Sequence, residues 1–353
     1  MTNEAMKKVL IKACIFSVVS MTLMLHRSAT KHIMITDAAD VSIDRELTDD
    51  SFNLLIDKNV SSKQKGKLII PLPKSVGSDH IAIEDNYADH ELLVYIDSRE
   101  EDFYCDTAVK SDLDIIKSAV CLTEGGTGKV CLEFELDGLY ANESKLTETG
   151  TLEVLFIKAC DEYDRIVLVD PIGGGADNGI TSEGISEKRV ALDIARELKA
   201  IADKDENNNI RFYFTRLSDS YVEYTDRYNF VKDTGADLLI GIGAYAGENA
   251  GDFGIRTTYN DSYYIRALNN AQFADLIEKN CIEKSGANAI GMEPALMEDE
   301  LLMDSTIPSC RVLLGDLNSK EAAGYLSDST YTGKIAAGIY AGVLEAFDKL
   351  ETN

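Results

Sequence analysis

The chain contains little histidine, and none of it lies beyond residue 100. Its 353 residues include four histidines. They are His26, His32, His80 and His90. Serine and cysteine nucleophiles depend on a base that is most often histidine, so residues 101–353 hold no Ser–His–Asp or Cys–His site. A metal site built on imidazole is excluded from the same residues.

Positive charge is also scarce. The chain has 35 lysines and arginines against 61 aspartates and glutamates, which gives a formal net charge of −26. Binding to nucleic acid by bulk charge is therefore excluded, because phosphate backbones are held by basic surfaces. Adhesion to other anionic polymers by charge is unfavourable for the same reason.

The seven cysteines do not form a recognisable metal motif. No C-x-x-C spacing occurs, which argues against a zinc ribbon. An odd number also leaves at least one thiol unpaired, even if the chain is exported to an oxidising compartment.

The clearest apolar run lies at the N-terminus, in residues 9–25, where Lys12 is the only charged residue. Two lysines precede the run. Residues 13–25 have the length of a signal-peptide apolar region, and the whole run is close to the shortest membrane span. No A-x-A cleavage site follows, so we expect residues 1–32 to be an uncleaved membrane anchor rather than a cleaved signal peptide. A buried core helix is the alternative. Either an anchor or a signal implies export of the remaining chain.

Residues 41–160 are predicted to form a β-rich domain. Short apolar runs, several of them alternating with polar residues, are separated by turn signals, which is typical of half-buried strands. These runs are Phe52 to Ile56, Lys67 to Leu72, His80 to Glu84, Glu91 to Ile96, Val130 to Leu136 and Thr151 to Ile157. Lys110 to Ala119 is expected to be a short helix.

A strand followed by a glycine-rich turn stands at residues 166–179. The turn reads D-P-I-G-G-G-A-D-N-G from Asp170 onward. It resembles the motif D-P-G-H-G-G-x-D-x-G of the zinc-dependent N-acetylmuramoyl-L-alanine amidases, which cut the bond between muramic acid and the peptide stem of peptidoglycan. Ile172 stands where that family has glycine. Gly173 stands where it has its first zinc-binding histidine.

The later motifs of the family follow in the right order. Glu187 opens a predicted helix and keeps the residue type of the second zinc ligand. Three segments resemble T-R-x-x-D-x-Y-x-x-x-x-x-R, A-D-x-x-I-S-I-H-A-N-A and I-P-A-V-L-V-E-x-G-F. They are residues 215–227, 236–246 and 307–316. In the last two, Gly243 replaces the second zinc histidine and Leu313 replaces the catalytic glutamate.

The chemistry of these replacements is the main functional signal. A catalytic zinc needs about three protein ligands and an open position for water, and a nearby carboxylate moves the protons. Glycine offers no ligand and leucine takes no proton. Of the positions Gly173, Glu187, Gly243 and Leu313, only Glu187 keeps the family residue type. The resemblance therefore implies a zinc scaffold without its ligands, and we expect no metal, no other cofactor and no catalytic residue.

Other carboxylates have structural explanations. Asp170 and Asp177 flank the glycine-rich turn, where short polar side chains satisfy backbone amides. The densest acidic run, Glu293, Glu298, Asp299, Glu300 and Asp304, is expected to be a solvated loop. Glu187 itself is interpreted as an acidic residue in the first turn of a helix, favourable against the helix dipole.

The predicted fold is an α/β three-layer structure, a twisted sheet flanked by helices, in residues 164–350. Its strands are expected at Ile166–Val169, Ile210–Phe214, Asp237–Ile242, Gly254–Tyr259 and Arg311–Leu314. Its helices are expected near Glu187–Ala202, Tyr221–Thr234, Tyr264–Lys284 and Gly333–Leu350. The smaller β-rich domain and the N-terminal hydrophobic anchor precede it. In composition and position, the β-rich domain resembles the small β-sandwich targeting domains that precede the catalytic domain in some of these amidases. An unrelated β-domain that only spaces the second domain from the membrane is the alternative.

The expected function is that of an inactive, amidase-like protein outside the cytoplasm. It is expected to bind peptidoglycan, an active wall hydrolase or another envelope protein, and to contact the membrane through residues 9–25. Two alternatives remain open. One is an active amidase with unusual metal ligands, and the other is a structural component of an envelope assembly.

Overall fold

The computed structural model describes residues 34–37, 51–98, 100, 102–124, 128–182, 184–205, 209–246, 254–262 and 266–351. The predicted anchor in residues 1–32, with its apolar run 9–25, lies outside these ranges and stays a prediction. Within the described ranges, no helix is both long enough and apolar enough to cross a membrane.

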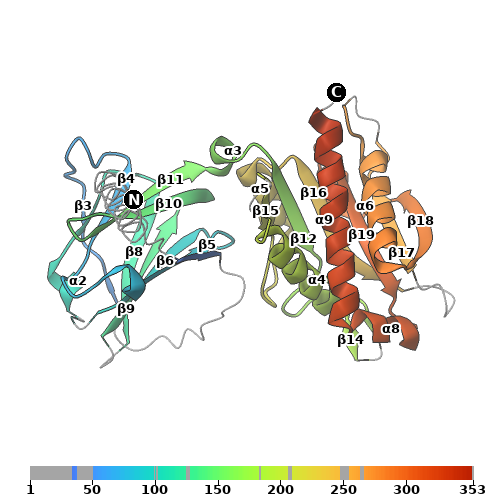
Figure 1. Ribbon diagram of the computed structural model, residues 1–353, viewed down its shortest axis with the longest axis horizontal. Helices are drawn as coiled ribbons and strands as arrows, with labels where there is room; N and C mark the ends of the chain where they lie inside the picture. The colour runs from blue at the N-terminus through green and yellow to red at the C-terminus, as the bar shows by residue number, and fades with distance from the viewer. Residues whose placement is uncertain are drawn as a thin grey trace, which may run out of the picture.

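Two sheets form the N-terminal part of the described chain (Figure 1). The first has the order β1 (Met34–Asp37), β5 (Ile81–Asn86), β6 (Glu91–Asp97), β9 (Lys129–Leu136), β8 (Ile116–Glu124) and β2 (Ser51–Asn53). The second has the order β10 (Tyr140–Leu146), β11 (Thr151–Lys158), β4 (Lys67–Pro71), β7 (Val109–Ser111) and β3 (Ile56–Asp57). Short helices are η1 (Ser78–His80), α2 (Phe103–Asp106) and α3 (Ala159–Glu162). One core cluster joins both sheets, so they pack face to face.

The predicted helix over Lys110–Ala119 is wrong, because this segment contains the end of β7 and the start of β8. Ile116 and Ala119 are both buried although they lie three residues apart, a spacing typical of helices. The spacing arises because the register of β8 shifts between Ile116 and Ser118. A β-bulge inserts an extra residue at such a shift and breaks the alternation of a strand.

A six-stranded sheet forms the centre of the C-terminal part and confirms the predicted mixed α/β fold. Its order is β15 (Arg211–Phe214), β12 (Ile166–Pro171), β16 (Leu238–Tyr245), β19 (Ser309–Asp316), β17 (Gly254–Tyr259) and β18 (Asn288–Pro294). The strands run parallel except where β17 meets β19. A two-stranded hairpin, β13 (Thr181–Ser182) and β14 (Ile185–Ser186), leads into the first long helix.

Helices cover both faces of this sheet. They are α4 (Glu187–Ala202), α5 (Tyr224–Thr234), α6 (Asn270–Ser285), α7 (Glu300–Asp304), α8 (Lys320–Leu326) and α9 (Ser329–Glu351). Helices α4, α6 and α9 share one apolar cluster with one face of the sheet (Figure 1). A side chain at Gly338 of α9 would lie 2.5 Å from the Cα of Cys281, so α6 and α9 pack with their backbones in close contact.

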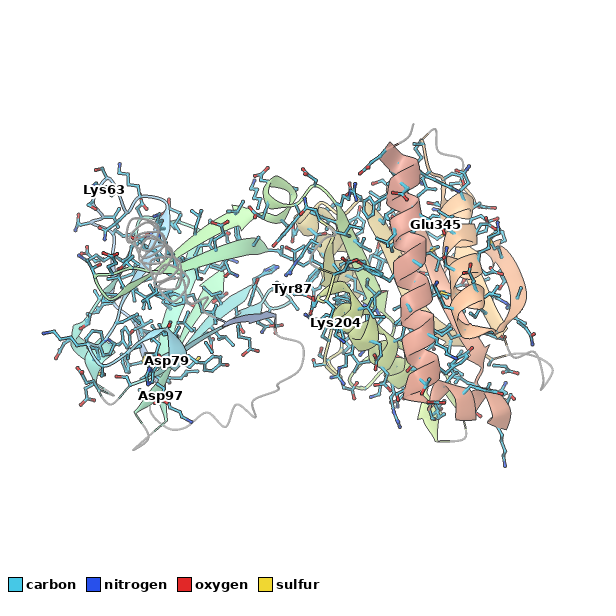
Figure 2. The ribbon with its side chains drawn as sticks, viewed as in Figure 1. Lys63, Asp79, Tyr87, Asp97, Lys204 and Glu345 are labelled. Carbon is cyan, nitrogen blue, oxygen red and sulfur yellow. The ribbon has the colours of Figure 1, made fainter. Side chains whose placement is uncertain are left out.

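The second face of the sheet packs against α3, α5, α7 and residues of the N-terminal part, which include Tyr87 and Leu139. Tyr87 lies at the junction of the two parts (Figure 2) and is only 5% exposed. Its hydroxyl accepts a hydrogen bond from the backbone amide of Phe214 at 3.1 Å. Its ring meets Tyr213 edge-on, with 5.1 Å between the ring centroids. The two parts are therefore joined by a packed aromatic contact. The boundaries predicted for the separate domains stay a prediction.

Candidate functional site

The four positions aligned with the family's chemistry lie at one end of the parallel strands. Gly173 follows β12, Gly243 lies in β16 and Leu313 lies in β19, directly paired with Gly243. Glu187 is the first residue of α4. A Cβ atom at Gly243 would lie 2.8 Å from the Glu187 carboxylate and 3.2 Å from Leu313. The fold thus brings these three positions together, as the motif order predicts.

Both carboxylate oxygens of Glu187 are engaged by backbone amides. Oε1 accepts a hydrogen bond from the amide of Ala244 at 2.8 Å, and Oε2 accepts one from the amide of Ile180 at 3.0 Å. The residue is only 5% exposed. Glu187 therefore ties the start of α4 to the end of β16 and to the glycine-rich turn. The helix-dipole interpretation was incomplete, because charge-assisted hydrogen bonds in a buried place are stronger than a surface dipole effect.

Apolar side chains occupy the space beside Gly243. A Cβ atom there would lie 3.3 Å from the Cγ2 atom of Ile172, in addition to its contact with Leu313. Both residues are partly exposed and lie on the same face of the sheet as Gly243. Ile172 replaces the family's glycine and Leu313 replaces its glutamate. Together they fill the space that a histidine side chain at position 243 would occupy.

The backbone at Gly173 also departs from what a histidine needs. Its φ is +73°, in the left-handed region that side chains other than glycine rarely adopt. A Cβ atom would lie 2.9 Å from the carbonyl oxygen of Asp177 and 3.0 Å from the Cβ of Lys188. The turn is shaped around glycine at this position.

These residues do not fit a zinc ion. The two glycines carry no donor, Leu313 has no proton acceptor, and the lone carboxylate already accepts two hydrogen bonds. Within the residues that the structure describes, no group of three or more His, Cys, Asp and Glu side chains is placed to hold a metal.

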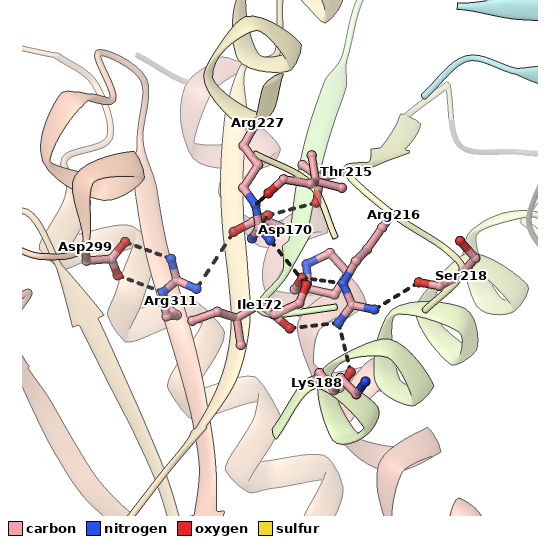
Figure 3. A network of polar contacts seen from close by, with 12 residues as sticks. Asp170, Ile172, Lys188, Thr215, Arg216, Ser218, Arg227, Asp299 and Arg311 are labelled. Carbon is pink, nitrogen blue, oxygen red and sulfur yellow. Dashed lines mark hydrogen bonds and ion pairs between the residues drawn. The ribbon is translucent and has the colours of Figure 1, made fainter. Parts of the chain in front are cut away.

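A network of ion pairs surrounds Asp170, which lies in β12 before the glycine-rich turn (Figure 3). Asp170 is 1% exposed, and its Oδ1 accepts hydrogen bonds from the hydroxyl of Thr215 at 2.8 Å and from Arg227 at 2.9 Å. The expected role of Asp170 in satisfying turn amides is therefore wrong, because its partners are side chains of later motifs. Asp177 does meet that expectation, since its Oδ1 accepts a hydrogen bond from the amide of Gly179 at 3.0 Å.

Arg216 holds the backbone of the glycine-rich turn. Its guanidinium donates to the carbonyl oxygens of Pro171 at 3.0 Å, Ile172 at 2.7 Å and Lys188 at 2.9 Å (Figure 3). Burial, helped by the nearby positive charge of Arg227, lowers the pKa of Arg216 to about 10. The retained T-R motif thus positions the turn, and it takes no part in acid–base chemistry at neutral pH.

Arg311 is a residue that the sequence analysis did not single out. Its guanidinium is nearly buried in β19 and donates two hydrogen bonds to Asp299, both at 2.7 Å. It also lies 3.8 Å from Asp170. Burial acts to lower the pKa of Arg311, but the neighbouring carboxylates, Asp299 first, raise it above its usual value. The signal was present, because an arginine inside an apolar strand needs a buried partner.

Gly241 and Asp299 accommodate the Arg311 side chain. A Cβ atom at Gly241 would lie 2.9 Å from its Cγ, so the serine of the family motif is replaced by glycine where the arginine passes. Asp299 was expected in a solvated acidic loop. That expectation is wrong for Asp299, whose side chain is only 17% exposed in its pair with Arg311.

Lys188 and Asp219 brace the glycine-rich turn from outside. The Lys188 ammonium donates to the carbonyl of Gly175 at 2.6 Å and to Asp219 at 2.9 Å. Asp219 also accepts from the Gly175 amide at 2.9 Å. The hydrogen bond from Lys188 lowers the pKa of Asp219.

Comparison with known proteins finds relatives of the C-terminal part of the chain. The sequence model of the N-acetylmuramoyl-L-alanine amidase family matches residues 167–345. A sporulation-specific N-acetylmuramoyl-L-alanine amidase of Bacillus subtilis is 28% identical over 195 residues, which are 53% of this chain and 70% of that protein. The amidase LytC of the same organism is 26% identical over 51% of this chain and 35% of its own length.

A solved N-acetylmuramoyl-L-alanine amidase from Clostridium difficile 630 shares 25% identity with this chain. The alignment covers 52% of this chain and 97% of that structure, with a TM-score of 0.48. The family match spans slightly more than half of the chain and includes all four positions of the degenerate site. The chain belongs to the N-acetylmuramoyl-L-alanine amidase family.

Proposed function

We propose that this chain is a non-catalytic member of the amidase family that acts outside the cytoplasm. It binds peptidoglycan or a protein of the cell envelope without cutting the wall, and it holds no zinc. The relatives supply the coarser part of this proposal, because they are amidases of peptidoglycan.

The single observation that carries the proposal is the hydrogen bonding of the Glu187 carboxylate. In a zinc enzyme the ligand carboxylate has a lone pair directed at the metal. Here each oxygen accepts a backbone hydrogen bond, and the space beside Gly243 is occupied by Ile172 and Leu313. The last family ligand has become a structural brace, which supports loss of the reaction rather than a change of metal.

The hydrolysis of an amide at neutral pH needs an activated water and a group that moves its proton. Leu313 stands at the position of that group, and the described residues of the α/β part contain no histidine that could replace it. The retained residues are Asp170, Arg216 and Arg227. The two arginines donate to carbonyl oxygens of the turn, and Asp170 accepts a hydrogen bond from Arg227. A scaffold that keeps its shape and loses its reactive groups fits a binding role.

Incubation with purified peptidoglycan tests this proposal. The full chain should release no free amino groups of the peptide stem, with or without added zinc, while an active family member serves as the positive control. The same samples should be sedimented to measure wall binding. Release that disappears on addition of a chelator would overturn the proposal.

A further inference from the structure

Exposed apolar side chains gather at one place on the α/β part. Six large hydrophobic side chains of the described residues are exposed, and three of them lie within one short segment. They are Met292, at 42% exposure, Leu296 at 75% and Met297 at 74%. The segment spans the end of β18, the edge strand of the sheet (Figure 1), and the loop before α7. Single exposed hydrophobics are ordinary, whereas a contiguous group marks an interaction site.

The loop that carries Leu296 and Met297 is held firmly on both sides. The amide of Ala295 donates to the carbonyl of Tyr259 at 2.8 Å, and the amide of Asp299 donates to the carbonyl of Leu296 at 3.0 Å. Directly after the loop, α7 is anchored by Leu301 and Leu302, which are 5% and 0% exposed. The loop cannot bury its apolar side chains by a small local collapse, so they stay available to a partner.

Arg311 supplies the strongest of these anchors. Its two hydrogen bonds to Asp299 tie the loop to the strand that bears Leu313. The family motif has an apolar residue at position 311 and serine at position 241, and both differ here in ways that accommodate the arginine. Arg311, together with Gly241 that leaves room for it, therefore also holds the loop with Leu296 and Met297 in place through Asp299.

Charge decides which partner fits. From residue 286 to residue 304 every charged residue is acidic. Glu298 and Glu300 are exposed beside the apolar side chains. The charges of two other acidic residues are compensated, because Glu293 pairs with Arg256 at 3.0 Å and Asp299 pairs with Arg311. A second copy of this chain, with its net charge of −26, would be repelled, and so would an anionic polymer or lipid surface. A surface that presents apolar side chains beside lysine or arginine is complementary.

We propose that the segment Met292–Met297 is the docking site for a partner protein that presents apolar and basic side chains. This inference rests on the proposed non-catalytic function and names the class of its partner. The structural change that removed the catalytic glutamate from β19 and placed Arg311 there converts this edge of the sheet into a recognition surface.

Site-specific photocrosslinking tests the docking site in the cells that make the protein. A photoreactive amino acid is placed at Leu296 in the full chain and, as a matched control, at Leu55, which is 59% exposed in the N-terminal part. We expect one discrete crosslinked protein from position 296 and none of the same identity from position 55. Crosslinks only to a second copy, only to lipid or glycan, or none at all would overturn the inference.

Binding with purified components then decides whether the crosslinked protein is a true partner. The double variant Leu296→Ser and Met297→Ser should bind it about tenfold or more weakly, because exposed apolar anchors carry much of an interface's affinity. Leu55→Ser should bind as the unchanged protein does, and raised salt should weaken binding through loss of the acidic contribution. Equal affinity for the double variant would overturn the inference.

This result is independent of the metal question. If the chain contains zinc and releases peptide, the non-catalytic function fails even though the docking measurements stand. If the chain is inactive and the double variant binds normally, the docking site fails while the non-catalytic function stands.

Discussion

The substitution Glu187→Gln separates a structural role of this carboxylate from a metal-binding role. The side chain is 5% exposed, and its oxygens accept hydrogen bonds from the amides of Ala244 and Ile180 at 2.8 and 3.0 Å. A glutamine keeps one acceptor oxygen and turns an NH₂ group toward the second amide. One charge-assisted hydrogen bond is lost and one buried donor is left without an acceptor.

Each of these effects has a known size. A hydrogen bond to a charged group contributes about 1.5–3 kcal/mol, and an unsatisfied buried donor costs about 1–3 kcal/mol. Local relaxation offsets part of the sum, so we expect Glu187→Gln to lower the free energy of unfolding by about 2–3 kcal/mol. A surface interaction with the helix dipole alone would contribute about 0.3–1 kcal/mol.

Urea unfolding followed by circular dichroism measures this difference. The matched control is Glu345→Gln, an exposed position on α9, which should change stability by less than about 0.5 kcal/mol. The loss at Glu187 should be the same with zinc, with a chelator and with neither. A loss that appears only when zinc is present would refute the structural role, and a loss no larger than that of the control would refute the hydrogen-bond assignment.

Three further changes test other parts of the structure. Burial raises the pKa of Glu278, so the stability that its protonated form contributes is present at low pH and lost as pH rises through the folded-state pKa. Glu278→Gln should therefore stabilise the protein against urea at pH 8 but not at pH 4. The control Glu283→Gln, at an exposed position, should change stability at neither pH. Tyr87→Ala should cost about 3–5 kcal/mol and split thermal unfolding into two transitions, because this ring joins the two parts of the chain; a single unshifted transition in calorimetry would contradict that. Histidines introduced together at Gly173 and Gly243 should not restore zinc binding in titration calorimetry, because the first position has a φ of +73° and the second is crowded by neighbouring side chains; stoichiometric binding would show that the turn can rearrange.

The elements of the α/β part were largely predictable because their apolar patterns are local. β17 occupies the residues expected for it, and β12, β16 and α4 lie where their apolar runs and helical spacing place them. β18 and α7 were not predicted. The strand has three consecutive exposed residues at its end and no alternation of burial, since it lies at the edge of the sheet. The helix is only five residues long.

The chemistry of the site was predictable only in part. The absence of ligands at Gly173 and Gly243 follows from residue type alone. The new role of Glu187 does not, because one of its partners is the backbone amide of Ala244, 57 residues away, and backbone amides leave no signature in a sequence. The Arg311–Asp299 pair was missed because a run of acidic residues is usually solvated. Only the folded strand shows which member of the run is buried.

Metal analysis of the purified chain tests the central claim most directly. The protein is purified without chelator, incubated with an excess of zinc, separated from free metal and analysed by mass spectrometry for zinc per chain. An active family member treated in parallel should retain close to one zinc. We predict that this chain retains far less than one, because Glu187 is the only remaining ligand and both of its oxygens are engaged. Retention of one zinc per chain, removed by a chelator and abolished by Glu187→Gln, would contradict the account.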